Sequence, residues 1–232
     1  MLAIEVSLSH SAIGATPSPA EAAPGVTALR GQILSTDEKP LPGVIVRDRG
    51  VRTVTDRDGF FLLTRLKPGQ SVLVVDGRSA GPGGTTDYGY YEVGVTAAEG
   101  VTTKLPFISY LPKIDHEHEV TLASPTTEEV VIGTPAVPGL ELHIPKGAIL
   151  TDPEGRPVTK VGLTPIPIDH TPFPIPPDRK MKVYFTIQPG GATIIGDDGA
   201  WLGAQIWYPN YAHALPGARA AFSHYDPDRG VW

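Results

Sequence analysis

One stretch of the sequence decides the fold: Asp56-Arg57-Asp58-Gly59-Phe60-Phe61-Leu62-Leu63-Thr64-Arg65-Leu66-Lys67-Pro68-Gly69. Its first four residues predict a tight turn that closes a hairpin, because an Asp side chain can bond nearby backbone amides and Gly tolerates a positive φ. A calcium loop would need a third acidic position and a distal Glu, which this stretch lacks. The apolar residues after the turn are expected to enter a core, and the final Pro-Gly turns the chain into the next buried strand. These core and turn positions are Phe61, Leu63, Leu66, Pro68 and Gly69.

Short alternating apolar runs lie on both sides of this stretch and are separated by turn residues. Leu29, Gly31 and Ile33 alternate with polar neighbours, which is the period-two signal of a strand. Further runs of this kind are 44–46, 52–55, 71–76, 88–95, 102–105 and 107–111. Because no helical pattern separates them, they predict an antiparallel β-sandwich.

The second half of the chain alternates again at 140–144 and 183–188. The Pro-rich passage 165–177 between them is expected along a sheet edge or over a face, because Pro donates no ladder hydrogen bond. We therefore expect an all-β chain in three parts. They are a lead-in and linker at 1–26, partly disordered and with a short strand at 3–8, a sandwich at 27–122 and a second β-rich domain at 123–232.

The composition of the chain argues against several classes of function. The net charge of −6 removes the main electrostatic driver of nucleic-acid binding, and the absence of Cys excludes disulfides and thiol catalysis. No apolar stretch reaches the roughly 18 residues that a membrane span needs. The amino-terminal residues do not form a convincing signal peptide, because no Lys or Arg precedes their apolar positions.

Three motifs have the character of functional sites, and each also has a structural interpretation. Gly77-Arg78-Ser79-Ala80-Gly81 matches the G-x-S-x-G nucleophile elbow, but the elbow needs a helix after the Ser and Pro82-Gly83-Gly84 prevents one. His116 and His118 would share one face of a strand and could reach one metal ion, although two His alone rarely fix zinc. A third ligand is not evident nearby, although folding could bring His143 or His170 to the pair. The alternative for His116 and His118 is a solvated polar strand end.

Tyr88 and Tyr90 are the candidates for ligand stacking. On one strand face they could stack on sugar rings, while aromatic residues are also the standard filling of a sheet face. The sequence leaves both interpretations open.

The deciding stretch, preceded by Pro42-Gly43-Val44, resembles the carboxypeptidase regulatory-like module. The resemblance implies a transthyretin-like β-sandwich of about seven strands, and it says little about function.

The second half is similar to the segment that precedes the repeats of bacterial Rhs/YD-repeat proteins. The resemblance covers nearly the whole chain, from about Thr27 to Trp232. It rests on 138–147, 164–169, 172–176, 184–192, 208–210 and 225–227, in that order. In that family a transthyretin-like domain and a β-rich plug domain sit beside a shell of YD repeats that encloses a cargo. The repeats themselves are absent from this sequence.

The carboxy-terminal residues predict a hairpin that is cut short. Residues 218–225 alternate like a strand, Asp226-Pro227-Asp228 turns the chain, and Val231-Trp232 would open the return strand. We therefore expect the second domain to be truncated.

The resemblance implies a non-enzymatic structural pair of domains without a cofactor. The pair would seat or seal the YD-repeat shell of a larger secreted or surface protein, and that shell would be its partner. The alternative is a carbohydrate-binding β-sandwich with glycans as partners, and a hydrolase comes third.

Overall fold

A computed structural model of the 232-residue chain describes residues 20–80, 87–176, 181–219 and 222–232. The fold is all-β, as predicted, and the described residues include two 3₁₀ turns, η1 (Gly77–Ser79) and η3 (His116–His118). The expected strand at 3–8 and most of the expected linker lie outside the described residues. Among those residues, no helix is long and apolar enough to cross a membrane.

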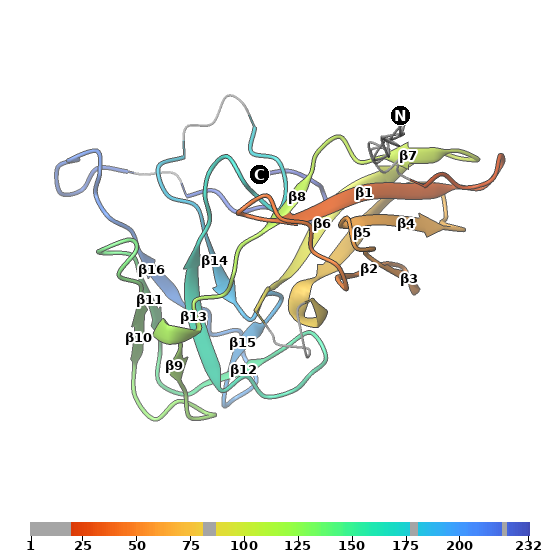
Figure 1. Cartoon of the computed structure of the whole chain (residues 1–232). Helices are drawn as coiled ribbons and strands as arrows, with labels where there is room; N and C mark the ends of the chain where they lie inside the picture. The colour runs from red at the N-terminus through yellow and green to blue at the C-terminus, as the bar shows by residue number, and fades with distance from the viewer. Residues whose placement is uncertain (1–19, 81–86, 177–180, 220–221) are drawn as a thin grey trace, which may run out of the picture.

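The first unit is a sandwich of two sheets that face each other (Figure 1). One sheet has the order β4-β1-β7, with β8 also on β1, and the other has the order β3-β2-β5-β6. The strands are β1 (Ala28–Ser35), β2 (Ile45–Asp48), β3 (Val51–Val54), β4 (Phe60–Thr64), β5 (Gly69–Asp76), β6 (Tyr90–Ala97), β7 (Thr102–Lys104) and β8 (Ser109–Leu111).

The Asp56–Gly59 turn joins the two sheets and does not close a hairpin, so that detail of the prediction is wrong. The strand before it, β3, pairs with β2, whereas the strand after it, β4, pairs with β1. Asp56 holds the corner, because its Oδ1 accepts hydrogen bonds from the backbone N–H groups of Asp58 (3.0 Å) and Phe60 (2.9 Å). Gly59 has φ +75°, and a Cβ there would collide with the carbonyl of Ile33. The residue chemistry was predicted correctly, but alternation does not reveal which strand each run joins.

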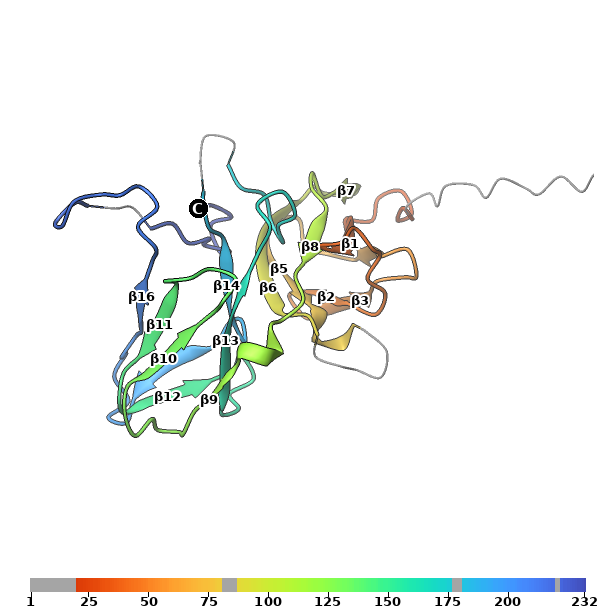
Figure 2. The same cartoon turned by 60° about the vertical axis from the view of Figure 1, so that its left-hand side comes forward.

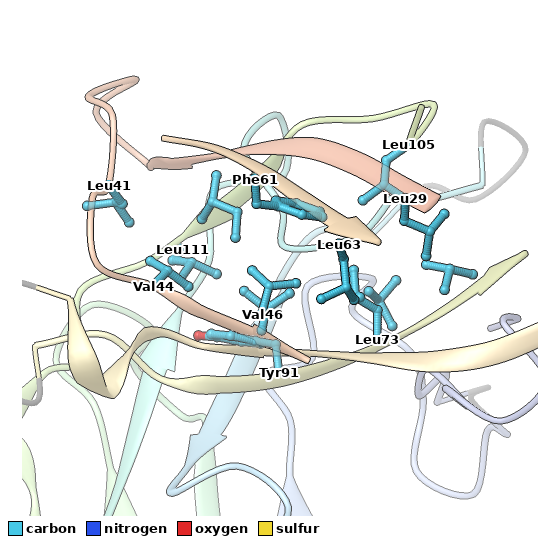
Figure 3. Close-up of a cluster of buried hydrophobic side chains, with 14 of the residues drawn as sticks. Leu29, Leu41, Val44, Val46, Phe61, Leu63, Leu73, Tyr91, Leu105 and Leu111 are labelled. Atoms are coloured by element: carbon cyan, nitrogen blue, oxygen red, sulfur yellow. The ribbon is translucent and has the colours of Figure 1, made fainter. Parts of the chain in front are cut away.

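The sandwich core lies between the two sheets (Figure 3). Phe61, Leu63 and Leu66 are buried in it, as predicted. Pro68-Gly69 leads into β5, whose Leu73 and Val75 are buried on the same core. Two pairings in this unit are parallel rather than antiparallel, β1 with β7 and β1 with β8.

The second unit contains three small sheets with the orders β10-β11-β16, β12-β15 and β14-β13-β9. A separate core cluster that includes Ile132, Leu142, Ile144 and Leu163 fills the space between them. The two units lie side by side in both views (Figures 1 and 2). The strands are β9 (Val120–Thr121), β10 (Val130–Gly133), β11 (Glu141–Ile144), β12 (Ala148–Thr151), β13 (Lys160–Pro165), β14 (Phe185–Gln188), β15 (Thr193–Gly196) and β16 (Gln205–Trp207).

The Pro-rich passage follows the edge of the first unit, which agrees with the prediction. Ser109 donates its hydroxyl to the carbonyl of Pro172 (2.8 Å), and the N–H of Tyr110 donates to the carbonyl of Thr171 (3.1 Å).

The lead-in is better anchored than predicted in its described part. The N–H of Ala22 donates to the Thr102 hydroxyl, and the N–H of Gly25 donates to the carbonyl of Gly100.

The carboxy-terminal residues do not form the predicted strand. Within 218–225, the described residues carry no strand, and the chain then turns so that Asp226 and Val231 form one antiparallel bridge. This turn packs on β5 and β6 of the first unit. The Gln70 side chain on β5 donates to the carbonyl of Asp228, and the N–H of Gly94 on β6 donates to the Tyr225 hydroxyl.

Candidate functional site

Ser79 is part of a structural turn. Its hydroxyl donates to the carbonyl of Gly43 (2.7 Å) and accepts the N–H of Ile45 (3.3 Å). These bonds tie η1 to the start of β2. An elbow Ser exposes its hydroxyl on a strained turn before a helix, so the geometry here differs from that motif.

His116 and His118 do not share a strand face, so the arrangement that made them candidate metal ligands is not formed. They lie in η3, and in a 3₁₀ turn residues two apart point to different sides. His116 Nδ1 bonds Glu119 Oε1 (2.9 Å), and His118 Nδ1 bonds Asp115 Oδ2 (2.8 Å). Each imidazole therefore has its own carboxylate, and no group of three or more ligating side chains able to hold a metal occurs in the described ranges.

Tyr88 and Tyr90 do not form a free stacking platform, which corrects that candidate. They are only 7% and 5% exposed. Tyr88 belongs to the sandwich core together with Tyr91, whereas Tyr90 lies outside that cluster. Tyr88 precedes β6, which begins at Tyr90, so the alternation of a single strand does not apply to the pair. The two rings do not share a face.

The Tyr90 ring is instead the floor of an ion-pair cluster at the junction of the two units. The guanidinium groups of Arg78 and Arg47 lie 5.2 and 5.6 Å from its centroid, a cation–π geometry. Arg78 Nη2 contacts Asp76 Oδ2 (2.8 Å) within the first unit and Glu154 Oε1 (3.2 Å) in the second. The Arg78 guanidinium thus links both units. We call the cluster of Arg47, Asp76, Arg78, Tyr90 and Glu154 the Arg78 clamp.

Burial and charge act in opposite directions in the Arg78 clamp. Burial alone would raise the pKa of Asp76, but the hydrogen bond and charge of Arg78 outweigh it, so this pKa is lowered. Arg78 likewise lowers the pKa of Glu154. Burial and a hydrogen bond to Glu92 raise the pKa of Tyr90 to about 12, so its hydroxyl is a neutral donor at pH 7. The clamp is held together by complementary charge, and its carboxylates are already paired.

Two glycines let the second unit approach Tyr90 closely. A Cβ at Gly190 would overlap the carbonyl of Tyr90, and one at Gly191 would lie 3.3 Å from Tyr90 Cε1. Both follow Gln188-Pro189 at the end of β14. In the sequence these residues are visible only as Pro189-Gly190-Gly191. A glycine needed for close approach of two segments looks the same in a sequence as a glycine in any turn.

An aromatic cluster forms a second contact between the units. Phe173 stacks on Tyr225 with centroids 4.1 Å apart, and Trp232 lies 5.4–5.7 Å from Phe173, Tyr184 and Tyr225. The indole N–H of Trp232 donates to the carbonyl of Pro174 (2.9 Å). The Tyr225 hydroxyl accepts the N–H of Gly94 (3.0 Å) on β6. The carboxy-terminal turn is therefore fixed to the first unit.

Exposed apolar side chains concentrate in one part of the chain. Among the residues that the structure describes, seven of the thirteen exposed large apolar side chains lie between 201 and 222, which is far denser than elsewhere. After β16, residues 208–219 project away from both units as the blue loop on the left of both views (Figures 1 and 2). We call 208–219 the apolar arm; Leu215 in it is 81% exposed, and Tyr208 and Tyr211 meet edge to face.

A cavity of about 330 Å³ opens inside the second unit. Its lining is mostly aliphatic, from Leu142, Val161, Ile187 and Ile194, with the Gln188 amide as a polar group. That amide is engaged with Thr186 and the N–H of Gly190. The cavity is an opening in the core and lacks a set of converging polar groups.

No protein-family model and no curated protein matches this sequence. Among solved structures, the Bacillus anthracis TIE protein is similar with a TM-score of 0.30 and 14% identity, over 79% of this chain and 31% of that chain. A streptococcal ancillary pilin is similar with a TM-score of 0.31 and 13% identity, over 80% of this chain and 55% of that chain. This chain thus spans less than two thirds of either protein.

Proposed function

We propose that this chain is a non-enzymatic structural module of a larger secreted or surface protein, in which it seats or seals a shell of Rhs/YD repeats. The observation that carries the proposal is the double joint between its units. The Arg78 clamp and the aromatic cluster tie both units to β6. A module that must hold a large partner in place needs such a joint, because otherwise domains joined by a linker move relative to each other.

The apolar arm is the surface that would contact the shell. Monomeric proteins rarely expose contiguous large apolar patches, and larger ones mark interaction sites. Tyr208, Tyr211 and Leu215 supply this surface at a distance from both cores. A wall of β-strands offers the complementary flat face, so we assign the arm to the partner and not to a ligand.

The test is a binding titration of the purified chain against a separately produced YD-repeat shell from the same genome. We expect binding, and we expect Tyr211→Ser with Leu215→Ser to weaken it by roughly tenfold, the scale of a central interface contact. Val54→Ser is the matched control, because Val54 is 52% exposed on β3 of the other unit. Failure of the unmodified chain to bind the shell would remove the proposed partner.

The non-enzymatic part of the proposal has its own test. A fluorophosphonate probe should leave Ser79 unlabelled, because the hydroxyl donates to a backbone carbonyl and not to a base. Stoichiometric labelling that disappears in Ser79→Ala would show a hydrolase instead.

A further inference from the structure

The outer face of the β10-β11-β16 sheet carries a grid of side chains in two rows. One row contains Val131, His143 and Gln205, and the next contains Gly133, Glu141 and Trp207. The alternate positions Ile132, Leu142 and Ile206 pack into the core, so the grid faces outward. Because Gly133 has no side chain, the face is low beside Glu141.

Trp207 is a fixed and accessible ring on this face. Its indole stacks on the His143 imidazole, with centroids 4.4 Å apart and planes at 23°. Although the imidazole covers one side of the ring, Trp207 remains 57% exposed. A ring held in this way offers its other side to solvent at a small cost in side-chain entropy.

Two carboxylates fix the stack and remain partly available. His143 Nδ1 bonds Glu129 Oε1 (2.6 Å), and His143 Nε2 bonds Glu141 Oε2 (3.1 Å), so the imidazole side chain is only 11% exposed. Each carboxylate uses one oxygen on His143 and has a second oxygen as an acceptor. The Gln205 side-chain amide, exposed in the adjacent row, adds both a donor and an acceptor.

We propose that this face binds a neutral hexopyranose unit of a glycan, stacked on Trp207 and hydrogen-bonded to Glu129, Glu141 and Gln205. A sugar ring has an apolar C–H face that suits an aromatic ring and a rim of hydroxyl donors that suits carboxylate oxygens. This inference does not depend on the proposed shell-seating role, which uses the apolar arm.

The charges on the face exclude other ligand classes. Phosphate or uronate groups would be repelled by the two carboxylates and by the chain's net charge of −6. An apolar protein surface would bury the second oxygen of each carboxylate without a partner, which is costly. A neutral polyol satisfies both conditions.

The test is an array of immobilised neutral oligosaccharides together with sialylated and uronate-containing ones, probed with the full chain and followed by calorimetry of the best free oligosaccharide. We expect binding only to neutral glycans, and we expect Trp207→Ala to weaken it by roughly tenfold. Gln205→Ala, which leaves the Trp207–His143 stack intact, should also weaken it. The calorimetry distinguishes two kinds of binding. A site for one sugar ring binds the free oligosaccharide as well as the immobilised form, whereas attachment to a polysaccharide surface requires the immobilised form.

Trp201→Ala is the matched control. Trp201 is 80% exposed but lies off the grid, so its loss should leave glycan affinity unchanged. The proposal fails if the array shows no neutral glycan bound, if acidic glycans bind better, or if Trp201→Ala and Trp207→Ala weaken binding equally. Binding that survives Gln205→Ala and Trp207→Ala in folded variants would also place the site elsewhere.

Discussion

Phe61 fills space that Gly31 leaves open. The two residues pair across β1 and β4, and a Cβ at Gly31 would lie 2.8 Å from the Phe61 ring. We expect Phe61→Ala to lower the free energy of unfolding by about 3–5 kcal/mol, because the surrounding core can only partly collapse. Urea denaturation would measure the change.

A comparison of Phe61→Ala with Asp56→Ala decides whether the core or the turn contributes more to the free energy of unfolding. Asp56→Ala removes two hydrogen bonds at an exposed corner, so we expect a smaller loss, about 1–2 kcal/mol. Neither the unmodified chain nor Asp56→Ala should respond to a calcium chelator. If Asp56→Ala cost more than Phe61→Ala and chelation destabilised the unmodified chain, the corner would be a metal site.

His143 makes the stability of the second unit depend on pH. Its hydrogen bond to Glu129, with that to Glu141, raises the pKa of His143 above the ordinary value. A raised folded-state pKa adds stability that is complete below the unfolded value of about 6.5 and disappears as pH rises through the folded value. Melting temperatures of the unmodified chain and His143→Gln should therefore differ more at pH 6 than at pH 9. An equal difference at both values would show that the imidazolium contributes nothing.

For single residues, the sequence predicted the local conformation and hydrogen bonds of a turn better than it predicted contacts between residues far apart in the chain. The Asp56 corner and the positive φ of Gly59 follow from side-chain reach and from the missing Cβ, which are local properties. The ring of Tyr90 depends on Arg78 and Glu154, and the latter lies far along the chain. No spacing rule connects such residues, so the sequence left open whether Tyr90 is a stacking ring or the filling of a sheet face.

At the scale of elements, Gly190 is the point where the turn after β14 meets β6. Gly190→Ala should destabilise the chain by roughly 1–3 kcal/mol, because the new methyl group would overlap the backbone carbonyl of Tyr90, which cannot move cheaply. Differential scanning calorimetry would measure it. Gly133→Ala is the control, since its Cβ would meet only the Leu140 carbonyl at an ordinary 3.6 Å. Similar losses for both would mean that close approach at Gly190 is unimportant.

Alternation predicted most strands of the first unit and fewer of the second. The runs at 60–63 and 71–76 became β4 and β5, because each is buried on one face only. The strand β16 has three residues and an exposed Trp, so its pattern is too short to read. The parallel pairing of β1 with β7 and β8 was missed because alternation reports which face is buried and carries no strand direction.

For the whole molecule, the Arg78 clamp should couple the units energetically. In a double-mutant cycle with Arg78→Leu and Glu154→Gln, we expect a coupling of about 0.5–1 kcal/mol, since Glu154 is partly solvated. The coupling should shrink in 1 M salt, where the Debye length is about 3 Å. The pair Arg57 and Asp58, which lies within one turn, is the control and should leave the contact between the units unaffected. A coupling indistinguishable from zero at low salt would leave the aromatic cluster as the main joint.

The bond between Gly94 and Tyr225 also bears on how fast the molecule reaches its final form. The two residues are 131 positions apart, and the contact closes one of the longest loops in the chain. Loop closure of this length costs entropy before any contact repays it, so chains rich in such contacts fold slowly. The part of β6 around Gly94 would stay uncovered until residues 225–232 dock on it, and during that interval one incompletely folded chain could associate with another. We therefore expect the docking of residues 225–232 at Gly94 to reduce this association.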